Sequence, residues 1–208
     1  MEEGGYKYRG WLSVPDWRLS IALIPKNGTR SINHALRRHF LPDLAPGDER
    51  MRVSWWRLPC AQKMFGHIKE SPGGIRRIRA MGFPLVAIAR DPVERFMSLY
   101  RCQIVEHRPG LGRYHEHVRT PEALMRWIEK RPWDNPHWLP QALYLDEADE
   151  IIPLHQLGQW WSENVSGAPE LQVENTTSGP SDVSDALRGR ILAHYAADQR
   201  HWDNLEGR

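Results

Sequence analysis

The chain has 208 residues, and its 28 Lys and Arg nearly balance its 26 Asp and Glu, giving a net charge of +2 with neutral histidines. That balance argues against a general nucleic-acid binder or a membrane-surface protein. The two cysteines are too few for a disulfide framework, and no apolar run approaches the ~20 residues that span a bilayer. The start, MEEGGYKYRG, lacks the apolar core of a signal peptide. We therefore expect one cytoplasmic domain over residues 1–208, without a membrane span.

Strand and helix signals alternate along the chain. Short apolar runs predict strands at residues 18–24, 63–68, 84–89, 150–153 and 171–174. Helical spacing predicts helices at 31–40, 74–81, 92–106, 121–130, 154–164 and 181–199, the last broken near Gly189. This alternation predicts an α/β fold in three layers, with a mainly parallel central sheet flanked by helices. Ligands of such folds bind at the carboxyl ends of the strands.

The segment IALIPKNGTRSI, residues 21–32, joins the first predicted strand to the first predicted helix through a polar turn without an acidic residue. A strand, a tight turn and a helix start gather backbone N–H groups and the positive end of a helix around one point, an arrangement that binds anions. The nucleotide triphosphatase loop, G-x-x-x-x-G-K-[ST], is a different pattern, because here the lysine precedes the single glycine. The candidate anion ligands are Pro25, Lys26, Asn27, Gly28, Thr29, Arg30 and Ser31.

A second turn follows the strand expected at 84–89, in the sequence VAIARDPVERFMSLYR. Asp91 is typical of a helix N-cap and Pro92 of a first helical turn. Arg90 leaves the strand at its carboxyl end, and Arg90 with Ser98 can hold a second phosphate through charge-assisted hydrogen bonds. The alternative is structural: Asp91 pairs with Arg95 at the helix start and Ser98 faces a neighbouring element.

Together, the two segments resemble the signatures of sulfotransferases that use 3′-phosphoadenosine 5′-phosphosulfate (PAPS), particularly the carbohydrate-type, family 2-like branch. The first signature, P-K-x-G/A-x-[ST]-[ST], surrounds the 5′-phosphosulfate in that family. The second, R-[DH/E]-P-x-x-R-x-x-S-x-Y-R, binds the 3′-phosphate. A weaker similarity is PHWLPQ at residues 136–141, which is similar to the H-W-x-P-Q segment of Golgi carbohydrate sulfotransferases. The matching positions are Pro25, Lys26, Gly28, Thr29, Ser31, Arg90, Asp91, Pro92, Arg95, Ser98, Tyr100 and Arg101.

This resemblance implies the P-loop NTPase-like sulfotransferase fold, with PAPS as donor and 3′-phosphoadenosine 5′-phosphate (PAP) as product. Golgi relatives carry a membrane anchor and luminal disulfides, whereas this sequence shows neither. The resemblance therefore implies a soluble member of bacterial or phage type. The chain is also short beside most carbohydrate sulfotransferases, which leaves little room for insertions that bind the acceptor.

Sulfuryl transfer needs a cation near the leaving oxygen and a base for the acceptor hydroxyl. Lys26 is the expected cation, and no metal is required because PAPS carries the activated group. Three residues are candidates for the base: His67 in KMFGHIKE, which resembles the G-H segment of uronyl 2-O-sulfotransferases, its neighbour Glu70, and His137. No histidine has convincing zinc spacing.

The acceptor is not identified by the sequence, and neither is the oligomeric state. Trp55, Trp56, His137 and Trp138 lie in irregular segments where they can contact a glycan or an aromatic alcohol, although large aromatic residues more often cover a core. We expect transfer to a hydroxyl group, with a saccharide as the favoured acceptor. Two alternatives remain open: a P-loop-type nucleotide-dependent phosphotransferase, and a non-catalytic nucleotide- or glycan-binding protein on the same fold.

Overall fold

The computed structural model describes residues 10–43, 78–105, 118–172 and 183–207. Contacts divide the chain into two compact units. The first unit contains the described residues of Met1–Ile88 and Tyr144–Glu174, and the second those of Ala89–Leu143 and Asn175–Arg208. The single sulfotransferase-like domain over residues 1–208 stays a prediction.

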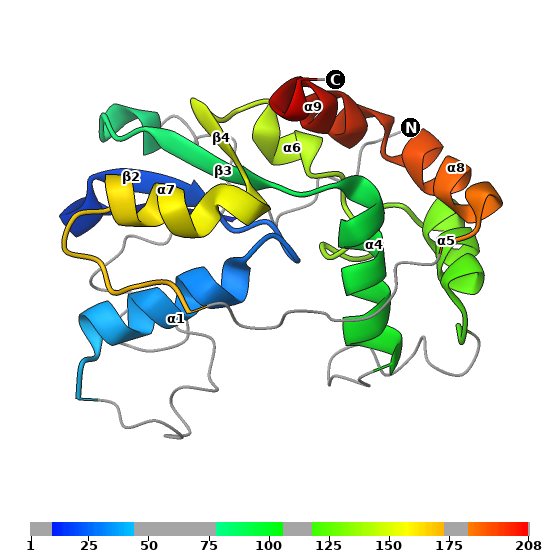
Figure 1. The fold of residues 1–208 in the computed structure, drawn as a ribbon, viewed down its shortest axis with the longest axis horizontal. Coiled ribbons are helices and arrows are strands. Elements are labelled where there is room, and N and C mark those ends of the chain that lie inside the picture. The colour runs from blue at the N-terminus through cyan, green and yellow to red at the C-terminus, as the bar shows by residue number, and fades with distance from the viewer. Residues whose placement is uncertain (1–9, 44–77, 106–117, 173–182, 208) are drawn as a thin grey trace. The chain divides into compact units, whose positions relative to one another are not determined.

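The first unit is built on an open sheet in which the strands follow the order β1-β2-β3-β4 (Figure 1). β1 (Trp11–Val14) is antiparallel to β2 (Leu19–Ala22), and β2 is parallel to β3 (Leu85–Ala89). The backbone N–H of Leu85 donates to Asp149 Oδ2 at 2.9 Å, and the N–H of Asp149 donates to the Leu85 carbonyl at 2.8 Å. β3 and β4 (Glu150–Pro153) therefore begin at the same end of the sheet. The predicted α/β class is confirmed, and β1 is an antiparallel strand that the sequence did not predict.

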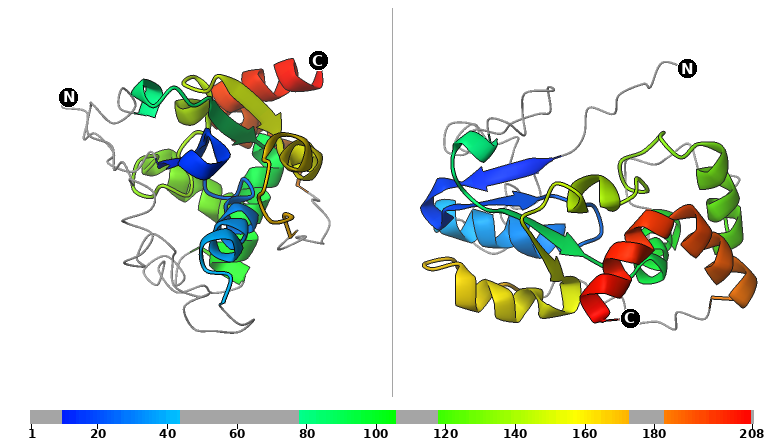
Figure 2. Two further views of the ribbon diagram at one scale, coloured as in Figure 1. Left: turned by 90° about the vertical axis from the view of Figure 1, so that its left-hand side faces the viewer. Right: turned by 90° about the horizontal axis from the view of Figure 1, so that it is seen from above.

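Two helices, α1 (Thr29–Phe40) and α7 (Leu157–Asn164), pack against this sheet (Figure 2). Two short 3₁₀ turns, η1 (Pro15–Trp17) and η5 (Leu154–Gln156), precede β2 and α7. Trp17 lies edge-on to Trp161 of α7, with ring centroids 5.1 Å apart. The shared core fixes α1 to the sheet, so the start of α1 is held at the carboxyl end of β2. Its buried members include Leu12, Ile21, Ile32, Leu36, Ile88, Leu157 and Trp161.

The second unit is helical. It contains α4 (Pro92–Tyr100), the π-helical turn η4 (Arg101–Val105), α5 (Pro121–Lys130), α8 (Asp185–His194) and α9 (Ala196–Glu206). A short helix, α6 (Ala142–Leu145), forms where the chain passes from this unit to the next segment of the first. A separate apolar core holds α4, α5 and α8 together, with Phe96, Met125, Trp138, Leu187 and Ile191 among its buried members.

The helix expected over residues 181–199 is two helices, and the predicted break near Gly189 is wrong. Gly189 lies inside α8, and the chain turns instead at Tyr195, whose φ of −104° and ψ of 36° are not helical. The Tyr195 hydroxyl donates to the Trp138 carbonyl at 2.8 Å, and its ring is buried. Anchoring of this side chain in the core, and not glycine flexibility, therefore sets the end of α8.

Most of the other expected elements agree with the structure where it describes them, although the helix expected at 92–106 ends at Tyr100 and continues as the π-helical turn η4. The strand at 150–153 and the helix at 121–130 have the expected bounds. Leu171 and Gln172 have no regular structure, so the strand expected at 171–174 is not formed over its described half. The strand expected at 63–68 and residues 74–77 of the next helix lie outside the described residues. Within the described ranges, no helix has the length and apolar character to cross a membrane.

Candidate functional site

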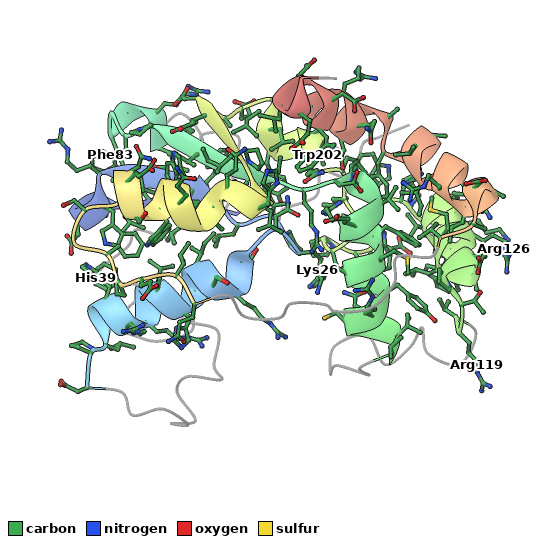
Figure 3. All side chains as sticks on the ribbon, in the orientation of Figure 1. Lys26, His39, Phe83, Arg119, Arg126 and Trp202 are labelled. Atoms are coloured by element: carbon green, nitrogen blue, oxygen red, sulfur yellow. The ribbon has the colours of Figure 1, made fainter. Side chains whose placement is uncertain are left out.

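A tight turn between β2 and α1 presents Lys26 (Figure 3). The N–H of Asn27 donates to the carbonyl of Ile24 at 3.2 Å, which closes a four-residue turn with Pro25 in second place and Lys26 in third. Lys26 has a φ of 74°. This is the pattern of a type II turn, whose third position normally holds glycine because it requires a positive φ. A side chain in the left-handed region costs about 1–2 kcal/mol, so the lysine occupies this position against a backbone penalty.

Gly28, at the N-cap of α1, cannot be replaced without displacing its neighbours. Its φ is 76°, and a Cβ atom built there would lie 2.9 Å from Leu157 Cδ2 and 3.0 Å from Leu154 Cδ1. The loop thus rests directly on the apolar side chains that begin α7. Only glycine fits both the conformation and the space.

Two side chains of the loop brace it from within. Asn27 is buried, and its Nδ2 donates to the carbonyl of Ile88 in β3 at 2.6 Å. Thr29 Oγ1 donates to the carbonyl of Ile24 at 2.6 Å. The sequence suggested Thr29 as a hydroxyl donor to phosphate, but in this structure its single proton closes the loop. That predicted role stays a prediction, and the observed role of both side chains is to fix the turn against the sheet.

The first turn of α1 has the electrostatics of an anion site. Ile32 N–H donates to the carbonyl of Gly28 at 3.1 Å, so the helical ladder begins there. The geometry of a helix points the preceding N–H groups, here those of Thr29, Arg30 and Ser31, out of its end. No acidic residue stands in this turn, and no side chain caps it. The positive end of the α1 dipole therefore faces the loop, and no acidic side chain in the first turn of α1 offsets it.

In the second unit, Arg90 stands at the start of α4. Asp91 caps this helix by accepting the Glu94 N–H at 2.9 Å, and Pro92 occupies its first position, as predicted. Arg90 Nε lies 3.5 Å from the exposed Glu94 carboxylate, and burial lowers the pKa of the Arg90 guanidinium. Ser98 is buried further along the same helix. The binding of a phosphate by Arg90 and Ser98 stays a prediction.

Arg95, the second arginine of the motif, lies in the interior of the second unit. Its side chain is 4% exposed, its Nη2 donates to the Leu139 carbonyl at 2.9 Å, and its Nη1 lies 3.8 Å from Asp198 Oδ2. Arg95 therefore lies near Asp198, whereas the sequence had suggested Asp91 as its partner. Burial raises the pKa of Asp198, while the charge of Arg95 and two backbone N–H groups act in the opposite direction. The pair connects α4 to α9 inside the unit.

His137 has a defined tautomer. Its backbone N–H donates to Asn135 Oδ1 at 2.9 Å, and because an N–H can only donate, the atom must be the amide oxygen. The ring Nδ1 lies 2.8 Å from the same oxygen, so Nδ1 carries a proton and Nε2 is the basic nitrogen of the neutral ring. His137 thus remains a candidate for the base.

Trp138 does not suit the acceptor-binding role suggested by the sequence. Its side chain is 1% exposed within the core of the second unit, and its Nε1 donates to the Arg131 carbonyl at 3.1 Å. An aromatic ring with no accessible face cannot stack on a sugar, so this prediction is corrected: Trp138 packs in the core. The other predicted site residues, His67, Glu70, Trp55 and Trp56, lie outside the described residues. In the described part of the chain, no group of three or more His, Cys, Asp or Glu is arranged to hold a metal ion.

Sequence reasoning missed two buried polar residues of the second unit, Gln141 and Asp198. Gln141 contacts the backbone of Arg90, and Asp198 contacts the backbone of Gln141. Gln141 was visible only as the last letter of PHWLPQ. Asp198, inside a helical pattern near the end of the chain, gave no signal of its own.

Comparison with known proteins gives one distant structural likeness. No protein-family model matches the chain, and no curated protein matches it. Among solved structures, the chain is similar to a sulfotransferase from Alicyclobacillus acidocaldarius, with 18% sequence identity and a TM-score of 0.49 over 88% of this chain and 92% of that one. So distant a likeness does not assign an activity, which has to come from the residues of the chain itself.

Proposed function

We propose that the protein is a PAPS-dependent sulfotransferase, which moves a sulfuryl group to a hydroxyl of an acceptor, with a saccharide as the favoured class. The observation that carries this proposal is Lys26 with a φ of 74°, in a turn where glycine would cost less. Non-glycine residues in left-handed backbone cluster at functional sites, where the side chain has a task that offsets the strain. At the positive end of α1, a cationic side chain suits a phosphate or sulfate group.

The proposed reaction is an in-line displacement at sulfur. The acceptor oxygen forms a bond to sulfur while the bond from sulfur to the 5′-phosphate oxygen breaks, and PAP leaves. Negative charge grows on the leaving oxygen, and the Lys26 ammonium offsets it. The backbone N–H groups at the start of α1 hold the 5′-phosphate. The acceptor proton passes to a base, for which His67, Glu70 and His137 are the candidates.

Arg90 and Ser98, both in the second unit, are the proposed ligands of a 3′-phosphate. Arg90 has a guanidinium suited to a phosphate, and it stands beside the capped start of α4 with Ser98 two turns further on. PAPS differs from ATP by its 3′-phosphate and its lack of a triphosphate. Arg90 is therefore the residue expected to make the chain prefer PAP.

Calorimetric titration tests the donor. The wild-type chain should bind PAP more tightly than ATP with magnesium, and Lys26→Ala and Arg90→Ala should both weaken PAP binding. Lys26→Ala should lower kcat/KM by about 10²–10³-fold, the usual effect of removing one group that stabilises the transition state. Lys130→Ala, at an exposed lysine that ends α5, is the matched control and should change neither quantity. A preference for ATP with magnesium would favour the phosphotransferase instead.

Catalysis and the acceptor need a separate assay. Mass spectrometry of products formed from PAPS and a panel of glycans and aromatic alcohols should reveal a sulfated product. His67→Ala, Glu70→Ala and His137→Ala are then compared for transfer rate and for PAP affinity. The base is the residue whose loss abolishes transfer and leaves PAP bound. If wild-type protein binds PAP and transfers sulfate to nothing in the panel, a non-catalytic binding protein becomes the better interpretation.

A further inference from the structure

A buried glutamine holds the backbone of Arg90 in two places. The Nε2 of Gln141 donates to the Arg90 carbonyl at 2.6 Å, and its Oε1 accepts the Arg90 N–H at 3.2 Å. The amide orientation follows from chemistry, because the carbonyl can only accept and the N–H can only donate. Gln141 has no exposed surface. The Gln141 side chain therefore satisfies the backbone N–H and carbonyl of Arg90, between β3 and α4, as a neighbouring β-strand would.

Gln141 is itself fixed by a buried carboxylate. Asp198 Oδ2 accepts the N–H of Gln141 at 3.0 Å, and Asp198 Oδ1 accepts the N–H of Ala142 at 2.8 Å. Asp198 has no exposed surface either. Both carboxylate oxygens are therefore used on the backbone from which the Gln141 side chain extends.

The same carboxylate also reaches α4. Its Oδ2 lies 3.8 Å from Arg95 Nη1, and Arg95 Nη2 donates to the Leu139 carbonyl, two residues before Gln141. Two arginines, one just before α4 and one in its first turns, thus have different surroundings. The Arg95 side chain is buried and bonded within the second unit. The Arg90 backbone is held by Gln141, and the Arg90 guanidinium lies beside the exposed carboxylate of Glu94. Buried polar groups of this kind specify one arrangement because each alternative leaves a polar atom unsatisfied.

We propose that Gln141 is a positioning residue for anion recognition: supported by Asp198, it holds the Arg90 backbone so that the guanidinium is ready for the 3′-phosphate of the nucleotide. This inference rests on the proposed function and adds a residue to it. The free-energy cost of ordering the Arg90 backbone is then met during folding, which leaves more of the interaction energy available for binding. Gln141 touches no substrate in this scheme and acts only through Arg90.

The test measures the preference for PAP over adenosine 5′-monophosphate (AMP), which lacks the 3′-phosphate. Gln141→Met keeps the length of the side chain and removes both hydrogen bonds. It should reduce the preference by about tenfold, the scale of losing two modest hydrogen bonds, with AMP affinity unchanged. Arg90→Ala should reduce the preference at least as far, and adding Gln141→Met to Arg90→Ala should reduce it no further. Such non-additivity identifies residues that act as one unit.

Gln103→Met is the matched control, because Gln103 is a second buried glutamine of this unit and makes neither bond to Arg90. It should leave the preference intact. If Gln141→Met does not fold, Gln141→Glu replaces it. The Gln141→Glu variant is measured at a pH where the buried carboxyl is ionised, so that it accepts the Arg90 N–H but cannot donate to the Arg90 carbonyl, and it should then also lose preference.

The possible failures are distinguishable. A wild-type chain that binds PAP no better than AMP overturns the proposed function and this inference with it. A wild-type preference that survives in Arg90→Ala, or in the folded Gln141 variant, overturns the inference and leaves the function standing. Equal weakening of PAP and AMP binding in the Gln141 variant would show a general structural role and also overturn it.

Discussion

The loop after β2 and the helix start after β3 are supported in opposite ways. The first is a backbone structure: a turn with a left-handed lysine, a glycine pressed on Leu154 and Leu157, and a helix end without an acidic residue. The second is a side-chain structure, in which a buried glutamine and a buried ion pair hold one arginine. Apolar contacts support the first, and satisfied polar groups support the second.

The difference has consequences for how each region fails. A loop that rests on apolar packing loses stability in proportion to the volume added or removed. A buried polar network fails more abruptly, because removing one member leaves its partners desolvated and unpaired. Substitutions that change the side-chain volume by the same amount should therefore destabilise the two regions to different extents.

The largest effect is expected at Asp198. Asp198→Asn removes the charge opposite Arg95 and puts an N–H₂ group beside backbone N–H donors. Leaving a buried charge without its counterion typically destabilises by about 3–5 kcal/mol. Denaturant unfolding followed by circular dichroism should show this loss. Glu129→Gln, which removes the exposed ion pair with Arg190 in the same unit, is the control and should barely shift the unfolding midpoint.

A smaller effect is expected at Gly28. Gly28→Ala adds the left-handed penalty of about 1–2 kcal/mol to the overpacking of a Cβ atom against two leucine side chains, for a loss of about 2–4 kcal/mol in all. Gly82→Ala isolates the first contribution, because Gly82 has a φ of 70° and a Cβ atom added there would meet nothing within 4 Å. The difference between the two thermal denaturation shifts measures the packing of the loop on the leucines. Equal shifts would show that this packing contributes nothing.

The same contrast explains what the sequence could reveal. The loop after β2 is contiguous, so Lys26 and Gly28 could be recognised from their order and from the strand and helix on either side. The support of Arg90 comes from residues 51 and more positions away, Gln141 and Asp198, which meet only when the chain is folded. Trp138 was misjudged for a related reason. Its residue type suits a surface site, and only the packing of the second unit's core shows that it is buried.

The smallest effect expected is a gain in stability at Lys26. Lys26→Gly relieves a left-handed penalty of about 1–2 kcal/mol, from which the greater chain freedom of glycine subtracts about 0.5–1 kcal/mol. The net gain is therefore about 0–1.5 kcal/mol, read as a small rise in the unfolding midpoint, while the proposed sulfate transfer should be lost with the ammonium group.

Arg18→Gly is the matched control for this substitution. Arg18 also has a positive φ, 51°, but it is an exposed residue that ends η1, where its N–H donates to the Pro15 carbonyl. Both glycine variants should gain similar stability, and only Lys26→Gly should lose activity. A stability loss in Lys26→Gly would mean that contacts of the lysine side chain hold the loop together. The left-handed backbone would then have a structural explanation, and it would no longer point to a catalytic role for the lysine.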